Sequence, residues 1–373
     1  MHEIKVLNIV YKLTFGGAEK VLLDLVNGSD TRFRHLICSL IPHDDFADQI
    51  RKEKRLIIDL HKSHGNDWKI PLAISQIIRK EKIDIVHCQN WGTYLEGYLG
   101  TRLQLKMPRF VFAVHGKVAS DLQGIPHRRL FIQRFLSNRV DGIITPSFDL
   151  KEDYAQTIGV SPSMINVIYN GVDIDVFKPA SDPVGSKQKF GFLPGHIVIG
   201  CVARFNRIKN IPGLIRGFAL CHGRFPETRL LLVGDGEDLE EVRQVIRQFN
   251  LEEEVKLLGR RLDVHLCLHA MDIFIQPSYY ECMPVTVLEA MSSGLPVIAT
   301  RIGGIPEIVT EGQNGILMNN PEPEVIASAI GRLVNDQDMR NRYAVNNRAL
   351  IEQKFSIKTM VQAYERFFDS IIQ

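Results

Sequence analysis

The feature that most constrains this 373-residue chain is an alternation of short β-branched runs with amphipathic segments, which occurs twice. The first series fills the N-terminal half, and the second begins near His196, after a polar, breaker-rich segment around 179–195. Short strands separated by helices of about ten residues or more form parallel sheets with right-handed crossovers. The sequence therefore predicts an α/β protein with two doubly wound, Rossmann-like domains.

Composition narrows the class of protein. Apolar residues make up 45% of the chain, and no apolar run approaches the ~20 residues that span a bilayer. The N-terminus leads straight into a strand without a signal-like segment, and six scattered cysteines show no C-x-x-C spacing. A net charge of +2 gives no reason to expect a nucleic-acid partner. We expect a cytoplasmic protein with reduced, buried cysteines.

The stretch Pro277–Glu307 carries the densest set of candidate functional residues. It is predicted to form a strand end, a loop, a helix that begins at Pro284, a buried strand and a glycine turn at Gly303. Glu281 stands at the end of the first strand, and Glu289 is expected about two turns into the helix. Ligands of open parallel sheets bind at the carboxyl ends of strands, where helix N-termini favour anions. Two carboxylates there are well placed to hold sugar hydroxyls beside a phosphate.

Other strand ends carry groups suited to anions. Arg204 and Lys209 follow a buried strand, where they can face a diphosphate or remain ordinary solvated loop cations. Gly234 lies in a strand-to-helix turn, and Gly16 and Gly17 lie in the first such turn of the chain. Glycines there permit unusual dihedral angles and a close backbone approach, or simply a tight turn. We expect an anion site at these strand ends.

Two histidines end strands. His115 is followed by a glycine at the end of its strand, which favours a functional role over a structural one. His87 ends another strand and is interpreted as structural.

Glu281 and Glu289 form an E-x7-E pair within PSYYECMPVTVLEAMSSGLPVIAT. This ordered pattern resembles the donor-site signature of the retaining glycosyltransferases of family four. Many members of that family have glycines where Cys282 and Pro284 stand here. The resemblance implies the GT-B fold, in which two Rossmann-like domains face a central cleft. It places an acceptor-side domain at 1–180, a nucleotide-sugar domain at 181–356, and a closing helix, 357–373, back on the first domain.

The resemblance also implies roles for particular residues. Glu289 would bind the ribose, and Glu281 and His115 would contact the transferred sugar. The implied catalytic residues are Glu281, His115, Arg204 and Lys209. The implied donor-binding residues are Gly16, Gly17, Gly234, Arg260, Arg261, Met283, Pro284, Val285, Thr286 and Glu289, with backbone N–H groups of Met283 to Thr286 on the diphosphate, where Pro284 lacks one donor.

No metal or other cofactor is expected. Asp173 and Asp175 form a D-x-D that could be taken for a metal motif. The surrounding Asn170–Asp173 segment instead resembles the N-G-V-D turn of family four, so we interpret the aspartates as part of a turn.

A basic segment after Pro126 has two interpretations. Arg128, Arg129 and Arg134 alternate with apolar and aromatic residues, which is typical of a helix lying on an anionic membrane. The same pattern fits an amphipathic helix that covers its own sheet. Peripheral attachment to the inner face of the cell membrane is thus one expectation.

The implied activity is that of a retaining, metal-independent hexosyltransferase. It would move a sugar from a nucleotide sugar, most simply a UDP-sugar, to a hydroxyl of a sugar acceptor. A lipid-linked acceptor would place it in the synthesis of a surface polysaccharide such as O-antigen. The alternatives are a nucleotide-sugar epimerase of the same fold and a non-catalytic nucleotide-sugar-binding protein.

Overall fold

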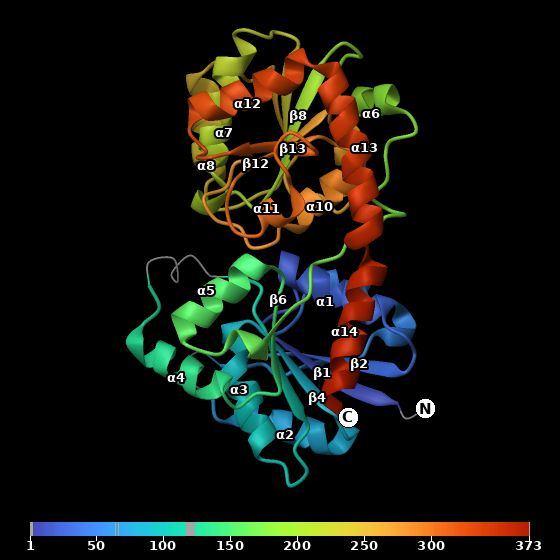
Figure 1. Ribbon diagram of the computed structural model, residues 1–373, viewed down its shortest axis with the longest axis vertical. Helices are drawn as coiled ribbons and strands as arrows, with labels where there is room; N and C mark the ends of the chain where they lie inside the picture. Colours follow the sequence, from blue (N-terminus) through green and yellow to red (C-terminus); the bar gives the residue numbers. More distant parts are fainter. Residues whose placement is uncertain (1–2, 64, 66, 117–123, 373) are drawn as a thin grey trace. The chain divides into compact units, whose positions relative to one another are not determined.

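The computed structural model describes residues 3–63, 65, 67–116 and 124–372 (Figure 1). Contacts divide the chain into two compact units. The first comprises Met1–Gly171 and Ile357–Gln373, and the second comprises Val172–Ser356. Each unit is built around its own sheet.

The sheet of the first unit has seven strands in the order β3-β2-β1-β4-β5-β6-β7. Every neighbouring pair is parallel, as the alternation predicts. Central strands of such sheets are largely apolar because helices cover both of their faces. The strands are β1 (Ile4–Val10), β2 (Phe33–Ser39), β3 (Ile57–Asp59), β4 (Ile85–Gln89), β5 (Arg109–Ala113), β6 (Gly142–Thr145) and β7 (Ile165–Val167).

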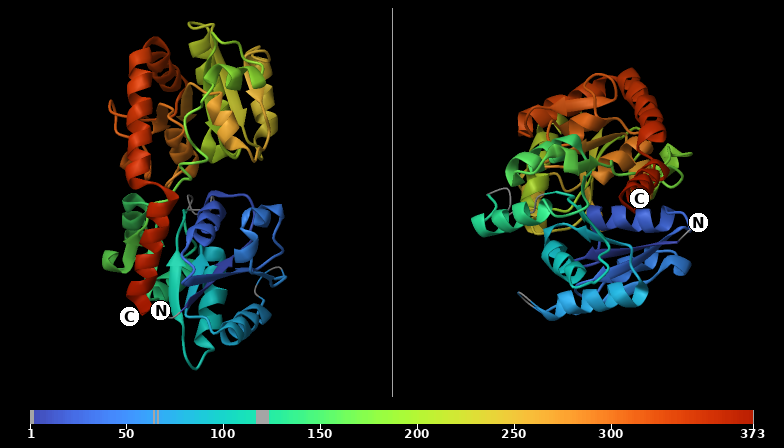
Figure 2. Two further views of the ribbon diagram at one scale, coloured as in Figure 1. Left: turned by 90° about the vertical axis from the view of Figure 1, so that its right-hand side faces the viewer. Right: turned by 60° about the horizontal axis from the view of Figure 1, so that its bottom comes forward.

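Helices lie on both faces of this sheet. The right-hand view of Figure 2 shows α1 and α14 on one side of the strands and α2 on the other. The last helix of the chain, α14, therefore belongs to the unit that contains the first strand. The helices are α1 (Gly17–Gly28), α2 (Lys69–Glu81), α3 (Trp91–Arg102), α4 (His127–Ser137), α5 (Phe148–Ile158) and α14 (Ile357–Ile372).

The connection between β2 and β3 contains no α-helix. The segment 44–53 forms two short 3-10 turns, Asp45–Gln49 and Lys52–Lys54, in place of an α-helix. The Asp44 side chain accepts a hydrogen bond from the N–H of Phe46, which closes a tight local turn. Aspartate at this position competes with the helical hydrogen bond in this way.

The sheet of the second unit has six parallel strands in the order β10-β9-β8-β11-β12-β13. Its core is a cluster of fully buried Ile, Leu, Val and Phe side chains from the strands and from the helices that cover them. The strands are β8 (Ile197–Val202), β9 (Thr228–Val233), β10 (Val255–Leu257), β11 (Ile273–Gln276), β12 (Val297–Thr300) and β13 (Gly315–Met318).

Eight α-helices belong to the second unit: α6 (Pro183–Lys189), α7 (Ile211–His222), α8 (Leu239–Gln248), α9 (Val264–His269), α10 (Val285–Ser292), α11 (Ile305–Ile308), α12 (Pro323–Asn335) and α13 (Gln337–Lys354). The first of them, α6, stands where the sequence suggested a linker. Asp182 caps it by accepting from the N–H of Gly185, 2.9 Å away, and Pro183 opens its first turn.

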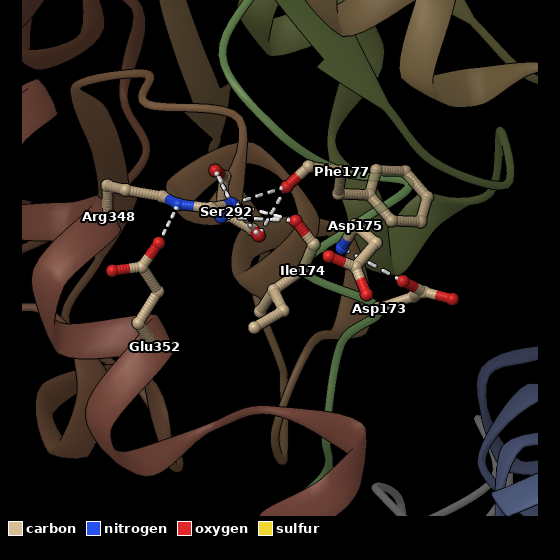
Figure 3. A network of polar contacts seen from close by, with 7 residues as sticks. All are labelled: Asp173, Ile174, Asp175, Phe177, Ser292, Arg348 and Glu352. Carbon is tan, nitrogen blue, oxygen red and sulfur yellow. Dashed lines mark hydrogen bonds and ion pairs between the residues drawn. The ribbon is translucent and has the colours of Figure 1, made fainter.

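The contacts divide the chain at Gly171, whereas the sequence placed the domain boundary at residue 180. Figure 3 shows why the intervening segment belongs to the second unit. Nη1 of Arg348, on α13, donates to the carbonyl oxygens of Ile174, Phe177 and Ser292 at 3.1, 2.9 and 2.9 Å. One half-buried guanidinium thus ties this segment to two helices of the second unit.

The two aspartates of the D-x-D pattern lie in the same segment (Figure 3). Oδ1 of Asp173 accepts from the N–H groups of Asp175, at 3.0 Å, and Val176, at 3.1 Å. The Asp173 carboxylate therefore closes a turn, as we expected from the sequence.

In the described part of the chain, none of the helices is long and apolar enough to cross a membrane. Each of the six cysteines is buried and carries a free thiol.

Candidate functional site

The loops after β8 and β11, neighbouring strands, meet at the carboxyl edge of the second sheet. A short 3-10 turn, Arg207–Lys209, follows β8, and the N–H of Tyr279 donates to the carbonyl of Ile208 at 2.7 Å. Nζ of Lys209 lies 2.6 Å from Oε1 of Glu281. Two residues that the sequence assigned to one site are therefore in direct contact.

The carboxylate of Glu281 is only 6% exposed, and its Oε1 accepts from three donors. Besides Lys209, these are Nε2 of Gln276 at 2.9 Å and Oγ of Ser278 at 2.8 Å. A buried charge is tolerable when it is both paired and hydrogen-bonded. Within the described residues Oε2 has no such partner, so one oxygen is fixed while the other remains able to accept from a ligand.

The glycine turn after β12 braces this loop. Gly303 has φ +50°, and a Cβ there would lie 1.8 Å from the carbonyl oxygen of Glu281. The N–H of Gly304 donates to the carbonyl of Cys282 at 2.7 Å. The sequence predicted a glycine turn here. The structure shows that the glycine lets two protein backbones touch, which sets the position of Glu281.

Helix α10 begins next to this loop and differs from expectation in two details. Pro284 is its N-cap, whereas the first helical residue is Val285. Glu289 is therefore only about one turn into the helix, where it is buried. The N–H groups of Val285 and Thr286 precede any intrahelical acceptor, so the helix leaves them available at its positive end. Met283, just before the cap, is buried.

Arg204 is not part of the Lys209–Glu281 cluster. Its side chain is 69% exposed, and Nη2 lies 2.8 Å from Oε1 of Glu237. The turn that carries Gly234 packs against the same loop, because a Cβ on Gly234 would lie 1.8 Å from the carbonyl oxygen of Ala203. As at Gly303, the glycine permits a contact between two strand-end loops.

The loop after β10 contributes Arg260 and Arg261. Arg260 is exposed, and the guanidinium of Arg261 is paired with Asp263, with its Nη2 2.6 Å from Oδ2. The carbonyl of Gly259 accepts from the N–H of Gly234 at 2.8 Å, so it already has a protein partner.

Three predicted residues belong to the first unit. Gly16 caps α1 with φ −169°, an extended conformation open to any residue, so the unusual dihedral expected there is wrong. Gly17 is the first residue of α1, whose N-terminus favours an anion. His115 lies past the end of β5, and its Nε2 is 2.6 Å from Oε1 of Gln89. Its backbone N–H donates to Oδ1 of Asn90 at 3.0 Å.

Helix α4 shows an exposed aromatic face. Phe131 and Phe135 are 72% and 47% exposed, and Arg128 and Arg134 are exposed beside them on the same helix. Arg129 differs, because its guanidinium lies over the ring of Trp91, 5.0 Å from the centroid. A helix whose only task is to cover its sheet would bury its phenylalanines.

Apolar residues at the end of α3 adjoin this face. Nη2 of Arg102 donates to the carbonyl of Arg139 at 2.8 Å, which joins the end of α3 to the segment after α4. Leu103, Leu105 and Met107 are all exposed beside that contact. We define the aromatic–basic patch as Phe131, Phe135, Arg128, Arg134, Leu103, Leu105 and Met107.

Sequence reasoning missed Gln89, Gln276 and Ser278. Gln89 and Gln276 are the last residues of β4 and β11, and Ser278 lies three positions before Glu281. A polar residue in such an apolar run needs a buried partner, and that signal could have identified them.

Both halves of the chain match family models. Residues 15–176 match the model described as Glycosyltransferase Family 4, and residues 186–350 match that described as Glycosyl transferases group 1. The chain belongs to glycosyltransferase family four.

Curated relatives of this glycosyltransferase include several enzymes of known reaction. It is 28% identical to the UDP-Gal:alpha-D-GlcNAc-diphosphoundecaprenol alpha-1,3-galactosyltransferase of Escherichia coli, over 82% of this chain and 80% of the relative. It is 23% identical to the N-acetyl-alpha-D-glucosaminyl L-malate synthase of Bacillus anthracis, with the same coverage.

The fold is GT-B. HepE of Anabaena, solved in complex with UDP and glucose, matches the glycosyltransferase with a TM-score of 0.86 at 24% identity. The match covers 98% of this chain and all of HepE. The two α/β units expected from the alternation of strands and helices are those of this fold.

Proposed function

We propose that this glycosyltransferase uses a UDP-sugar, retains the configuration of the transferred sugar and requires no metal ion. The observation that carries the proposal is the Lys209–Glu281 contact at the carboxyl edge of the second sheet. A lysine held there by a buried carboxylate provides a fixed positive charge at the loop that leads into α10, whose first N–H groups are also donors. Fixed donors and charges stabilise a diphosphate as its negative charge grows, which is the task a metal ion performs in other transferases.

The environment of Glu281 favours one route to retention. Its Oε1 is held by Lys209, Gln276 and Ser278, which makes the carboxylate a weak nucleophile. We propose that Glu281 binds the sugar through Oε2 while the reaction proceeds on a single face. The bond between the anomeric carbon and the diphosphate breaks, the acceptor oxygen bonds to that carbon on the same face, and the acceptor proton passes to the leaving phosphate.

The remaining predicted residues take supporting roles in this proposal. Arg204 would leave its exposed pair with Glu237 to bind the diphosphate, and Glu289 would hold the ribose. Arg260 and Arg261 would lie near the base, and Gly16, Gly17 and Gly234 would border the donor.

We further propose a lipid-linked sugar as the acceptor and a role in surface-polysaccharide synthesis at the inner face of the cell membrane. The name of the Escherichia coli relative includes a diphosphoundecaprenol-linked acceptor, which supports this class. The aromatic–basic patch supports contact with an anionic bilayer, because exposed aromatic rings enter the interface and arginines attract its headgroups.

The test of the activity is a set of incubations with UDP-glucose, UDP-galactose and UDP-N-acetylglucosamine, with and without a polyprenyl-diphosphate sugar and with EDTA present. We expect UDP release only with the acceptor, no loss of turnover in EDTA, and an α-linked product by NMR. Interconversion of donors without acceptor would favour an epimerase. Donor binding without turnover would favour a binding protein, and an inverted product would end the proposed mechanism.

The test of the membrane surface is co-sedimentation with vesicles that contain phosphatidylglycerol. Replacing Phe131 and Phe135 with Ser should lower the vesicle-bound fraction of the protein several-fold. The loss of each ring removes about 2 kcal/mol of stabilisation that comes from burying apolar surface. Leu72→Ser is the matched control, because Leu72 is an exposed apolar residue of α2 outside the patch. Equal vesicle binding by the wild type, the Phe131 and Phe135 variant and Leu72→Ser would contradict membrane contact through the aromatic–basic patch.

A further inference from the structure

A chain of hydrogen-bonded side chains crosses one face of the first sheet and ends at His115. It runs from His35 on β2, through Asn8 on β1, to His87 and Gln89 on β4. The four residues before His115 are buried. Helix α14 covers the chain with the rings of Tyr364 and Phe368, whose centroids lie 5.8 and 5.6 Å from that of His87.

Backbone carbonyls fix the direction of the hydrogen bonds at the start of this chain. Ser29 uses its hydroxyl proton to donate to the carbonyl of Leu25 at 2.7 Å. Its oxygen therefore accepts from Nε2–H of His35, 3.0 Å away. Nδ2 of Asn8 donates to the carbonyl of Leu36 at 3.2 Å and to Nδ1 of His35 at 3.1 Å. The amide oxygen of Asn8 must then face the opposite way, toward β4.

That oxygen sets the proton on His87. Oδ1 of Asn8 lies 3.0 Å from Nδ1 of His87, so Nδ1 carries the proton and donates. Nε2 of Gln89 lies 3.1 Å from Nδ1 and 3.3 Å from Nε2 of the same ring, and only Nε2 has a lone pair left to accept. The amide oxygen of Gln89 is thereby directed to Nε2 of His115, which must donate to it.

Burial keeps the three imidazoles neutral. Burial lowers the pKa of His35 and of His87 to about 3 and that of His115 to about 4. A neutral ring with its proton on Nε2 has an unprotonated Nδ1. Among the described residues, Nδ1 of His115 has no hydrogen-bond partner.

We propose that Gln89, oriented by His87 and Asn8, is a positioning residue that locks His115 in the Nε2–H tautomer, so that Nδ1 accepts a hydrogen bond from a hydroxyl of the donor sugar. The tautomer lock stands on the first unit alone. The sugar contact rests on the proposed function. His115 would serve as a neutral acceptor, which adds no positive charge beside an anomeric carbon that itself becomes positive as the leaving group departs.

The first experiment reads the tautomer without any substrate. Long-range ¹H–¹⁵N NMR of protein with labelled histidine distinguishes a protonated from an unprotonated ring nitrogen, and comparison with His115→Gln assigns the signal among twelve histidines. We expect protonated Nε2 and unprotonated Nδ1 for His115 in the wild type. A protonated Nδ1 would overturn the proposal, whatever the activity of the protein and whether or not any variant folds.

The second experiment breaks the chain at two points. Gln89→Leu removes the acceptor for His115, so the ring signals should shift toward a mixture of tautomers. His35→Phe changes an equally buried residue of the same chain, but Asn8 keeps its orientation through Leu36 and the His115 signals should not move. A shift of the His115 ring signals in His35→Phe, or no shift in Gln89→Leu, would contradict the proposed order of hydrogen bonds.

The third experiment tests the sugar contact with a panel of singly deoxygenated UDP-sugars. The wild type should use one deoxy donor about tenfold less well than its parent, the usual loss for one hydrogen bond. Gln89→Leu should lower kcat about tenfold on the parent donor with KM changed less than about twofold, and should lose that discrimination. A Gln89→Leu enzyme with unchanged kcat and discrimination would overturn the sugar contact. A wild type that turns over no donor would overturn the proposed function and leave the tautomer lock to the NMR result.

Discussion

The charged loops of the second unit and the neutral chain of the first hold functional side chains by different physical means. Glu281 is a buried ion whose charge is compensated by Lys209 and whose place is set by backbone contact with Gly303. His115 is held by hydrogen bonds between uncharged groups, each of which fixes the next. The first arrangement supplies a strong local field, whereas the second supplies orientation without charge. In the proposed reaction, the fixed field suits the leaving diphosphate, and the neutral acceptor suits a sugar carbon that becomes positive.

The largest effect on turnover should follow from removing the positive charge of Lys209. We expect Lys209→Ala to lower kcat about a thousandfold, the range for losing one fixed donor to a developing anion. Lys187→Ala is the control, because Lys187 is a buried lysine whose Nζ likewise pairs with a carboxylate, 2.7 Å from Oδ2 of Asp272, on another part of the same unit. Both variants should lose stability in urea, but only Lys209→Ala should lose turnover. Near-normal kcat in Lys209→Ala would show that the field does not act on the leaving group.

A substitution at Gly303, whose turn holds the Glu281 loop in place, should have the second-largest effect on activity. A Cβ at residue 303 would displace the Glu281 loop, and a misplacement of about 1 Å in a reacting site costs roughly a hundredfold. Steady-state kinetics of Gly303→Ala tests this. Gly312→Ala is matched for backbone strain, with φ +76°, but a Cβ there meets nothing within 4 Å. If the two variants lose activity equally, strain rather than the clash with Glu281 is responsible.

Acid should destabilise the fold of the first unit, because its hydrogen-bonded side chains include the buried, neutral His35 and His87. The folded pKa of His35 and of His87 is about 3, against an ordinary value of 6.5. Between these values the unfolded chain binds more protons, so the free energy of unfolding falls as pH drops below about 6.5 and levels off near 3. Each histidine adds a slope of up to about 1.4 kcal/mol per pH unit. Urea titrations at pH 7 and pH 5 measure it, and His35→Phe should have a shallower dependence.

The smallest effect should come from breaking the exposed ion pair between Arg204 and Glu237. Arg204 and Glu237 are 69% and 60% exposed, and exposed pairs contribute little to stability. Glu237→Gln should change the free energy of unfolding by less than about 0.5 kcal/mol in a urea titration. A loss above 1 kcal/mol would mean that this pair, like Lys209–Glu281, is part of the folded framework.

The sequence was informative where a residue's role depends on its own element. Strand ends that carry Glu281, Lys209 and His115 could be placed, because parallel strands bring their carboxyl ends to one edge. Local capping was harder to foresee, and Asp182 turns a polar, glycine-containing linker into α6.

Contacts between distant segments lay beyond the sequence pattern. Asn8, His35 and His87 stand on three different strands, and their connection depends on strand register, in which Asn8 pairs with His87. Gly303 could be predicted as a turn, but the backbone that it touches could not. The sequence could not show that the segment around Ile174 packs with the second unit, because its anchor, Arg348, lies far away in sequence.

The return of α14 to the first unit also bears on biosynthesis. Tyr364 and Phe368 close over His87, so the ribosome must translate past residue 368 before that polar array is sealed from water. A polypeptide interrupted after residue 356 would carry an open N-terminal sheet with an unshielded histidine. Synthesis of α14 is thus coupled to maturation of the unit that contains the first strand.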